Sequence, residues 1–323
     1  GEQRKKEGGS VFGGGSRASV AVTILVKDPR HAGQARIHYS DIGDYLSREE
    51  KLAAVAAAES LPGLEPRTAI IPNAHGDWLN QRRNDFETFL PIGDKEGGRA
   101  VIGLYSLGLA TGRDAWVVGS SARAVRASVN SMVKAYNGLL ESASVPDRDP
   151  RRISWNRNLE SDFTRGRRLA FAPEESLRAS CYRPFFRQAV YFNRALNAMV
   201  YRLNDLFPTP KHQNFGMVAM GPRTEAVPAV LMANSMPDLA YFTYAGQFFA
   251  RWRYEKVGAD EGMLDLGHHG EGEVIDGYRR VDNITDHALA TFRAAYGEAI
   301  TKDDIFFYVY GLLHSPDYRS TYA

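Results

Sequence analysis

The sequence predicts an α+β protein in which strand-forming segments occur early and helices close the chain. β-branched and apolar residues run together from Val20 to Val26, which is typical of a well-covered strand. Apolar residues recur at helical spacing from Ser121 to Leu140, which predicts an amphipathic helix. Two further helices are predicted at Thr285 to Tyr296 and at Thr301 to His314.

The N-terminal part of the chain has the pattern of a β-hairpin. A turn at Asp28-Pro29 separates the apolar run from an alternating run, Ala35 to Tyr39. We expect these two strands to form the edge of an α/β sheet. The preceding FGGGSR segment suggests a phosphate-binding loop, but such loops follow a strand and open a helix, whereas this one precedes a strand. We therefore interpret it as a turn.

Capping signals place the next helix and the last one. Ser47 and Glu50 form a predicted capping box at the start of a helix that runs to Ser60, where Leu61-Pro62-Gly63 ends it and marks a first domain boundary. Thr301 and Asp304 repeat the capping pattern. Between these ends, turn-rich pieces indicate a compact α+β region with many loops, and the segment after residue 202 predicts a strand, a turn and a second strand.

Arginine and aromatic residues are concentrated between residues 151 and 202. This stretch has eleven arginines, four acidic residues and no lysine. Nine aromatic residues are interleaved with them: Trp155, Phe163, Phe171, Tyr182, Phe185, Phe186, Tyr191, Phe192 and Tyr201. Guanidinium groups suit phosphate oxygens and guanine edges and stack on aromatic rings, so the stretch predicts a surface for DNA or RNA. The alternative is that the arginines pair with acidic residues from elsewhere and the aromatics form core.

The composition is that of a soluble globular protein. The chain has 323 residues, of which 44% are hydrophobic and 24% charged, and its net charge is only +2 because an acidic stretch from Asp260 to Asp286 offsets the arginines. The one cysteine, Cys181, excludes an internal disulfide framework and a cysteine-based zinc site, and it is expected to be a small core residue. No apolar run approaches the ~18 residues of a membrane span, so we expect a cytoplasmic protein that does not bind a membrane. The polar N-terminus suggests a chain cut out of something longer.

Six long segments, spread over nearly the whole chain, carry a resemblance to a known family. They are FGGGSRASVAVTILVKDP, ARIHYSDIGDYLSREEKL, NAHGDWLNQR, YSLGLATGRDAW, SCYRPFFRQAVYFNR and ITKDDIFFYVYGLLHSPDYR. Together they resemble the C-terminal part of single-polypeptide (Type ISP) restriction-modification enzymes and their adenine-methylating relatives. In that family a nuclease, a helicase-like motor, an adenine methyltransferase and a target recognition domain follow one another on one polypeptide.

The resemblance implies a division of the chain into three parts. Residues 1–60 would be the C-terminal edge of the methyltransferase domain, a short β-hairpin remnant of its α/β sheet with a linker helix. Residues 61–284 would be a mixed α/β target recognition domain, and residues 285–323 a helical element packed on it. The implied function is recognition of a specific double-stranded DNA sequence, which positions the DNA for adenine methylation or for translocation and cleavage by the upstream domains.

The sequence departs from an active methyltransferase. It has no Asn/Asp-Pro-Pro-Phe/Tyr catalytic motif and no S-adenosylmethionine loop that precedes a helix. Both belong upstream of Val11 in the family, so S-adenosylmethionine is expected in the upstream methyltransferase domain and no cofactor in this chain. The chain alone is expected to transfer no methyl group.

Three groups of residues are candidates for DNA contact. The YRPF element places Tyr182 and Arg183 beside a proline that fixes the backbone, as a base or phosphate contact requires, although Arg183 also fits a buried structural network. Arg187 follows in the same segment. A cationic loop around Gly166 suits phosphate contact and comprises Arg165, Arg167 and Arg168. Four neighbouring residues could form hydrogen bonds to adenine and guanine edges: Asn80, Gln81, Arg82 and Arg83. The alternative is that they form the solvated start of a helix.

Two other functions were weighed. A metal-dependent nuclease could use Asp260, Glu261, Asp265 and His268, but these lie in a glycine-bearing acidic stretch rather than at rigid strand ends. The neighbouring pair His268 and His269 has no helix-spaced partner, which favours a loop over a metal site. An RNA-binding module remains an alternative, although the sequence lacks the aromatic strand motif typical of one.

Overall fold

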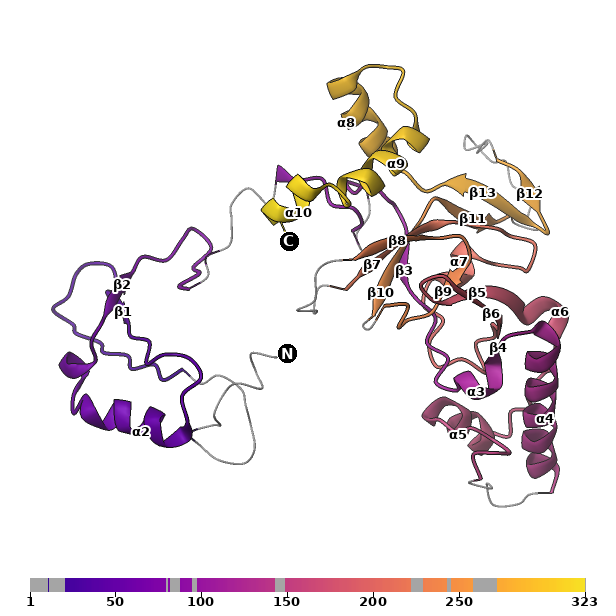
Figure 1. The fold of residues 1–323 in the computed structure, drawn as a ribbon, viewed down its shortest axis with the longest axis horizontal. Helices are drawn as coiled ribbons and strands as arrows, with labels where there is room; N and C mark the ends of the chain where they lie inside the picture. The colour runs from indigo at the N-terminus through magenta and orange to yellow at the C-terminus, as the bar shows by residue number, and fades with distance from the viewer. Residues whose placement is uncertain are drawn as a thin grey trace. The chain divides into compact units, whose positions relative to one another are not determined.

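The computed structural model describes residues 11, 21–79, 81, 88–94, 98–142, 149–221, 229–242, 245–257 and 272–322. The chain divides into two compact units, residues 1–89 and 90–323, which we describe separately (Figure 1). The mixed α and β class expected from the sequence is confirmed. The division into domains at residues 60 and 284 remains a prediction.

The described residues of the first unit include an α-helix, a 3₁₀ helix and a pair of short strands. Its elements are β1 (Ile37–Tyr39), α2 (Arg48–Ala57), the 3₁₀ helix η1 (Leu61–Gly63) and β2 (Thr68–Ile70). The predicted capping box of α2 is confirmed. The Ser47 hydroxyl accepts a hydrogen bond from the Glu50 amide at 3.2 Å, and the Ser47 amide donates to the Glu50 carboxylate at 2.8 Å. Local side-chain chemistry therefore fixes where α2 begins.

The hairpin expected between Val20 and Tyr39 is wrong. β1 pairs antiparallel with β2, and residues 21–36 form no strand in the described part of the chain. The side chains of Val22 and Leu25 are 81% and 85% exposed. An apolar strand is stable only when a neighbour satisfies its backbone and covers a face, and this segment has none among the described residues. Its origin in a methyltransferase sheet remains a prediction, and FGGGSR lies outside the described residues.

The described residues of the second unit form three sheets. Its strands are β3 (Tyr105–Leu107), β4 (Val118–Gly119), β5 (Leu177–Arg183), β6 (Phe186–Tyr191), β7 (Gly216–Met220), β8 (Val230–Ala233), β9 (Met236–Pro237), β10 (Gly246–Ala250), β11 (Trp252–Lys256), β12 (Val274–Ile275) and β13 (Tyr278–Asp282). One antiparallel sheet has the order β3-β10-β7-β8, and a second has the order β4-β6-β5-β9, in which β9 runs parallel to β5. The third has the order β11-β13-β12. The strands predicted after residue 202 correspond to β7 and β8.

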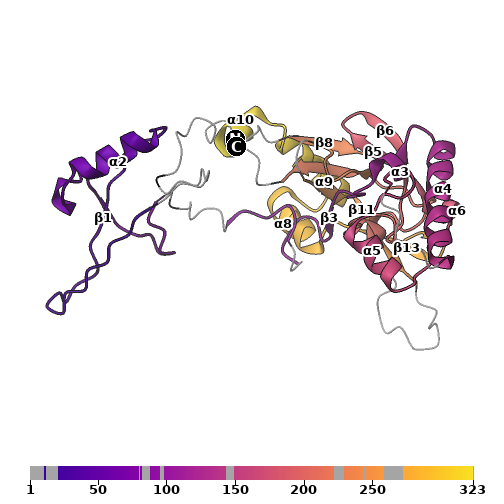
Figure 2. The same ribbon diagram turned by 90° about the horizontal axis from the view of Figure 1, so that it is seen from below.

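The helices of this unit are α3 (Asp114–Val117), α4 (Ala122–Glu141), α5 (Arg157–Thr164), α6 (Pro173–Ser176), α7 (Leu203–Leu206), α8 (Asp286–Tyr296), α9 (Lys302–Leu312) and α10 (Pro316–Tyr322). Most of them lie on two sides of the sheets, α8, α9 and α10 on one and α3, α4, α5 and α6 on the other, while α7 lies among the strands (Figures 1 and 2). The helices predicted for α4, α8 and α9 are confirmed, and Ser121, Thr285 and Thr301 cap them through their side chains. α4 buries its predicted apolar face, including Val125 and Tyr136. No helix in the described ranges is long and apolar enough to cross a membrane.

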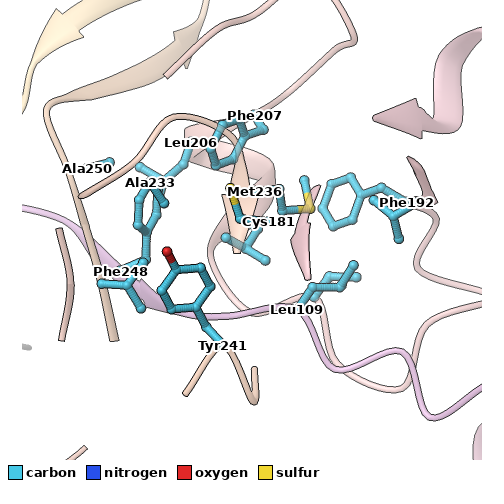
Figure 3. Close-up of a cluster of buried hydrophobic side chains, with 14 residues drawn as sticks. Leu109, Cys181, Phe192, Leu206, Phe207, Ala233, Met236, Tyr241, Phe248 and Ala250 are labelled. Carbon is cyan, nitrogen blue, oxygen red and sulfur yellow. The ribbon is translucent and has the colours of Figure 1, made fainter. Parts of the chain in front are cut away.

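Three clusters of buried side chains hold the sheets and helices together. Between the sheets, Figure 3 shows Cys181 and Met236 of neighbouring strands lying with Leu109, Phe207 and Tyr241. The predicted core position of Cys181 is confirmed, because its thiol is buried within 2.9 Å of the Ser235 hydroxyl. The second cluster joins α4 and α5 to the sheet that contains β6, and the third joins α8 and α9 to β7 and β10.

A buried arginine ties the sheet region to the last helices. The guanidinium of Arg251 donates two hydrogen bonds to the Asp282 carboxylate, at 2.7 and 3.0 Å, and a third to Asp303 of α9 at 2.7 Å. Its carbon lies 3.9 Å from the centre of the Trp252 ring. The side chain is only 3% exposed, so its charge depends on these partners.

Candidate nucleic-acid interface

The YRPF element forms the tip of a β-hairpin. β5 and β6 pair antiparallel, with Arg183 opposite Phe186, and the register shifts between Cys181 and Arg183. Pro184 and Phe185 make the connection between the strands. Phe185 has φ +61°, in the left-handed region, and its side chain is 93% exposed. The proline therefore turns the chain where the sequence predicted a fixed backbone, and the aromatic residue after it lies in solvent rather than anchoring the element.

Two carboxylates, the exposed Asp114 and the buried Asp238, hold the base of this hairpin tip. The Tyr182 hydroxyl donates to Asp114 at 2.7 Å, and this hydrogen bond raises the pKa of Tyr182. Arg183 donates to Asp238 at 2.8 Å, and its guanidinium carbon lies 4.1 Å from the centre of the Tyr182 ring. Burial raises the pKa of Asp238, although Arg183 opposes that shift. Arg183 is thus held in one orientation.

Arg183 keeps part of its hydrogen-bonding capacity. Its bonds to the Tyr182 carbonyl and to Asp238 both use Nη1, so Nε and Nη2 have no hydrogen-bond partner among the described residues. Its side chain is 41% exposed. Arg187, on the neighbouring strand, is also exposed and donates to the Asn234 side chain at 2.6 Å. The hairpin tip therefore presents guanidinium groups beside an exposed aromatic ring.

The cationic loop directly follows α5. Gly166 has φ +67°, and a Cβ there would meet nothing within 4 Å, so glycine serves the turn rather than a close contact. Arg167 pairs with Asp162 at 3.0 Å and Arg168 with Glu141 at 2.6 Å, and all these arginine side chains are well exposed. Arg165 is exposed and makes no ion pair in the described structure. Exposed ion pairs contribute only about 0–1 kcal/mol, so a phosphate can replace either carboxylate at little cost.

Helix α4 fixes the backbone of this loop. The Tyr136 hydroxyl donates to the Arg167 carbonyl at 2.9 Å. The Asn137 side chain both accepts from the Leu169 amide at 2.9 Å and donates to the Leu169 carbonyl at 3.0 Å. The loop therefore has a defined path although its arginine side chains reach into solvent. The sequence did not predict that either residue supports this loop. The only signal was a polar pair at the apolar face of the helix.

Comparison with known proteins places this arrangement in a family. The Type ISP C-terminal specificity domain matches residues 100–323. The chain belongs to this family. The matched residues include the YRPF hairpin with its partners Asp114 and Asp238, and also the arginine loop. A comparison with curated protein sequences finds no match.

Three solved structures are similar to this specificity-domain chain. The ATP-dependent Type ISP restriction-modification enzyme LlaBIII bound to DNA is 28% identical over 92% of this chain and 18% of its own, with a TM-score of 0.68. A nuclease-deletion mutant of the Type ISP enzyme LlaGI, in complex with a DNA substrate mimic, is 31% identical over 98% and 27%, with a TM-score of 0.66. The DrdV–DNA complex is 26% identical over 89% and 27%, with a TM-score of 0.67. The chain thus spans less than a third of each of these proteins.

The structure of this Type ISP specificity domain divides the arginine-rich stretch between core and surface. Arg178 is largely buried, which lowers its pKa to about 10, and it donates to the backbone carbonyls of Glu175, Leu177 and Pro208. Most of the aromatics are also core or packed against it, among them Trp155, Phe163, Phe171, Tyr191 and Phe192. For these residues the alternative interpretation, core and internal pairing, is the correct one. The exposed arginines include Arg187 at the hairpin tip and the three of the loop after α5, together with Arg151, Arg152, Arg157, Arg194 and Arg202 elsewhere in the stretch.

The remaining candidates belong to the first unit or to segments outside the description. The Gln81 amide donates to the Ile71 and Asp77 carbonyls at 2.7 and 3.2 Å, and so closes its own loop. Asn80, Arg82 and Arg83 lie outside the described residues, as do the acids and histidines proposed for a nuclease, Asp260, Glu261, Asp265, His268 and His269. Among the residues that are described, no three His, Cys, Asp or Glu side chains lie close enough to hold a metal ion.

Proposed function

We propose that this chain recognises a specific double-stranded DNA sequence. In the whole enzyme it would position that DNA for adenine methylation, and for translocation and cleavage, by upstream methyltransferase, helicase-like and nuclease domains. The observation that supports this most directly is the likeness to three DNA-bound restriction-modification enzymes over 89% to 98% of the chain. Two exposed guanidinium surfaces on rigid supports, the hairpin tip and the loop after α5, give the proposal its chemistry.

The two surfaces suit different kinds of contact. The loop after α5 has three exposed arginine side chains on a backbone that α4 holds, which suits the regularly spaced phosphates of any duplex. Arg183 is oriented by Asp238 and the Tyr182 ring, with Nε and Nη2 left over, which suits a hydrogen bond to a base edge. We therefore assign positioning to Arg165, Arg167 and Arg168, and sequence reading to Arg183 with support from Arg187 and Tyr182.

Competition binding tests the proposal. The chain is used to select duplexes from a random-sequence pool, and a selected duplex then competes with scrambled duplex and with single-stranded RNA. We expect the selected duplex to bind at least tenfold more tightly than either competitor, since specific sites usually exceed non-specific ones by about 10³-fold or more. Preference for the RNA supports an RNA-binding module instead. Cleavage that requires a divalent metal supports a nuclease.

Changing one arginine of the loop after α5 to alanine is expected to weaken binding to all duplexes equally. Log affinity falls linearly with log salt concentration, with a slope of about −0.9 for each phosphate neutralised. Arg165→Ala should therefore reduce the slope by roughly one unit on both selected and scrambled duplexes. Arg30→Ala removes an exposed charge from the first unit and is the control. An unchanged slope for the loop variants, or a loss confined to one sequence, contradicts phosphate contact.

Arg183→Lys is expected to reduce specificity more than general affinity. Lysine retains a charge beside Asp238 and so keeps the protein folded, but its single ammonium nitrogen replaces the planar fork that carries the Nε and Nη2 donors. Affinity for the selected duplex should fall by about 1–3 kcal/mol, with a much smaller change on scrambled DNA. Arg202→Lys, which alters an exposed pair with Asp205, is the matched control. Equal losses on both duplexes show that Arg183 does not read a base.

A further inference from the structure

The exposed ring of Phe185 at the hairpin tip adds no burial that would stabilise the fold. Phe185 is 93% exposed, more than any other large hydrophobic residue described, so its ring gains nothing from burial. Its φ of +61° follows Pro184, and this order is typical of a type II turn, in which the residue after the proline is ordinarily glycine or asparagine. A phenylalanine at this position is unfavourable for its backbone and for its side chain.

The support beneath the ring is rigid. The Tyr182 hydroxyl bonds to Asp114 and the Arg183 guanidinium to Asp238, directly before the turn. Below these bonds, β5 pairs with β6 on one side and with β9 on the other. The tip is thus anchored in a four-stranded sheet, so the backbone that carries the ring is held in place and little backbone entropy is lost when a partner covers the ring.

The surroundings of the ring indicate what covers it. Arg183 lies before the turn and Arg187 after it, both with exposed side chains, and Phe186 beside the ring is half-exposed. Aromatic rings and arginines are also enriched in protein interfaces, so the choice of partner follows from the proposed recognition of duplex DNA, which the similar solved structures hold. A nucleic-acid duplex offers both chemistries together, since its bases present stackable faces and its phosphates accept from guanidinium groups.

We propose that Phe185 inserts its ring into the base stack of the bound DNA duplex. The ring opens one base step, and the guanidinium groups beside it bind the adjoining backbone or base edges. Apolar wedges of this kind unstack a step and bend the duplex, most easily at flexible pyrimidine–purine steps. The proposal rests on the proposed recognition of duplex DNA, and it adds a contact that depends on how easily the sequence deforms.

Phe185→Asn and Phe185→Trp in the full chain test this insertion. Asparagine tolerates a positive φ, so Phe185→Asn should melt no lower than wild type, yet bind the selected duplex about tenfold to a hundredfold more weakly with an unchanged salt slope. Phe185→Trp keeps a stacking ring and should bind nearly as wild type does. With 2-aminopurine placed in turn at each step of the duplex, wild type and Phe185→Trp should raise the fluorescence at one step, and Phe185→Asn should not.

The possible results separate the two proposals. If wild type selects no duplex at all, both the recognition function and the insertion are wrong. If wild type binds but Phe185→Asn binds equally well, with the same fluorescence at every step, only the insertion is wrong. A lower melting temperature for Phe185→Asn, with unchanged binding, likewise assigns the ring to the stability of the turn and overturns the proposal.

Discussion

Phe306→Asp is expected to prevent stable folding of the second unit. The Phe306 side chain is fully buried, and its ring meets Phe215 edge-on with ring centres 5.5 Å apart. It belongs to the cluster that joins α8 and α9 to β7 and β10. Loss of a core phenylalanine costs about 3–5 kcal/mol, and a buried carboxylate without a partner costs more. Thermal and denaturant unfolding should show no cooperative transition, or one at much lower stability.

The next residue along the helix supplies the control for this substitution. Phe307 is 53% exposed, stacks on Phe215 with ring centres 6.4 Å apart and meets Phe306 edge-on with ring centres 5.5 Å apart. Phe307→Ala should therefore cost only about 1 kcal/mol, the value of a surface aromatic pair. Equal effects at the two positions contradict the packing of α9. Ile305 and Phe306 are buried with residues of β7 and β10, as the apolar pattern of this helix predicted.

Arg251→Ala is expected to lower the free energy of unfolding by about 3 kcal/mol, because it leaves the Asp282 carboxylate without its partner. The buried guanidinium makes three hydrogen bonds to carboxylates and joins the third sheet to α9. The estimate is at the low end for a buried pair, because the Asp282 side chain is 28% exposed and retains some water. Urea unfolding followed by circular dichroism measures the difference.

Arg253→Ala is the matched control for the Arg251 substitution. Arg253 lies two residues further along the chain, in β11, and pairs with Glu255 at 3.0 Å, with both side chains exposed. Its removal should change stability by no more than about 1 kcal/mol. If the two variants unfold at the same urea concentration, the Arg251 cluster does not stabilise the fold through its buried charges.

The sequence by itself determined where α2, α4, α8 and α9 begin, and it determined part of the site. Ser47, Ser121, Thr285 and Thr301 begin their helices as predicted, because a cap satisfies backbone donors within three residues and needs no distant partner. The sequence also showed the apolar stripe of α4 and the concentration of arginine between residues 151 and 202, since both are patterns along the chain. The six long segments that resemble Type ISP enzymes indicated the correct family.

Tertiary structure alone decided how strands pair and which arginines are available. β1 pairs with β2 rather than with the apolar run before it, because pairing depends on which strands meet after the intervening helix folds. Arg178 and Phe192 enter the core, whereas Phe185 and the arginines of the loop after α5 remain outside. The carboxylate that orients Arg183 comes from Asp238, 55 residues away. Composition cannot distinguish these fates, because burial and ion pairing depend on neighbours that only the folded chain brings together.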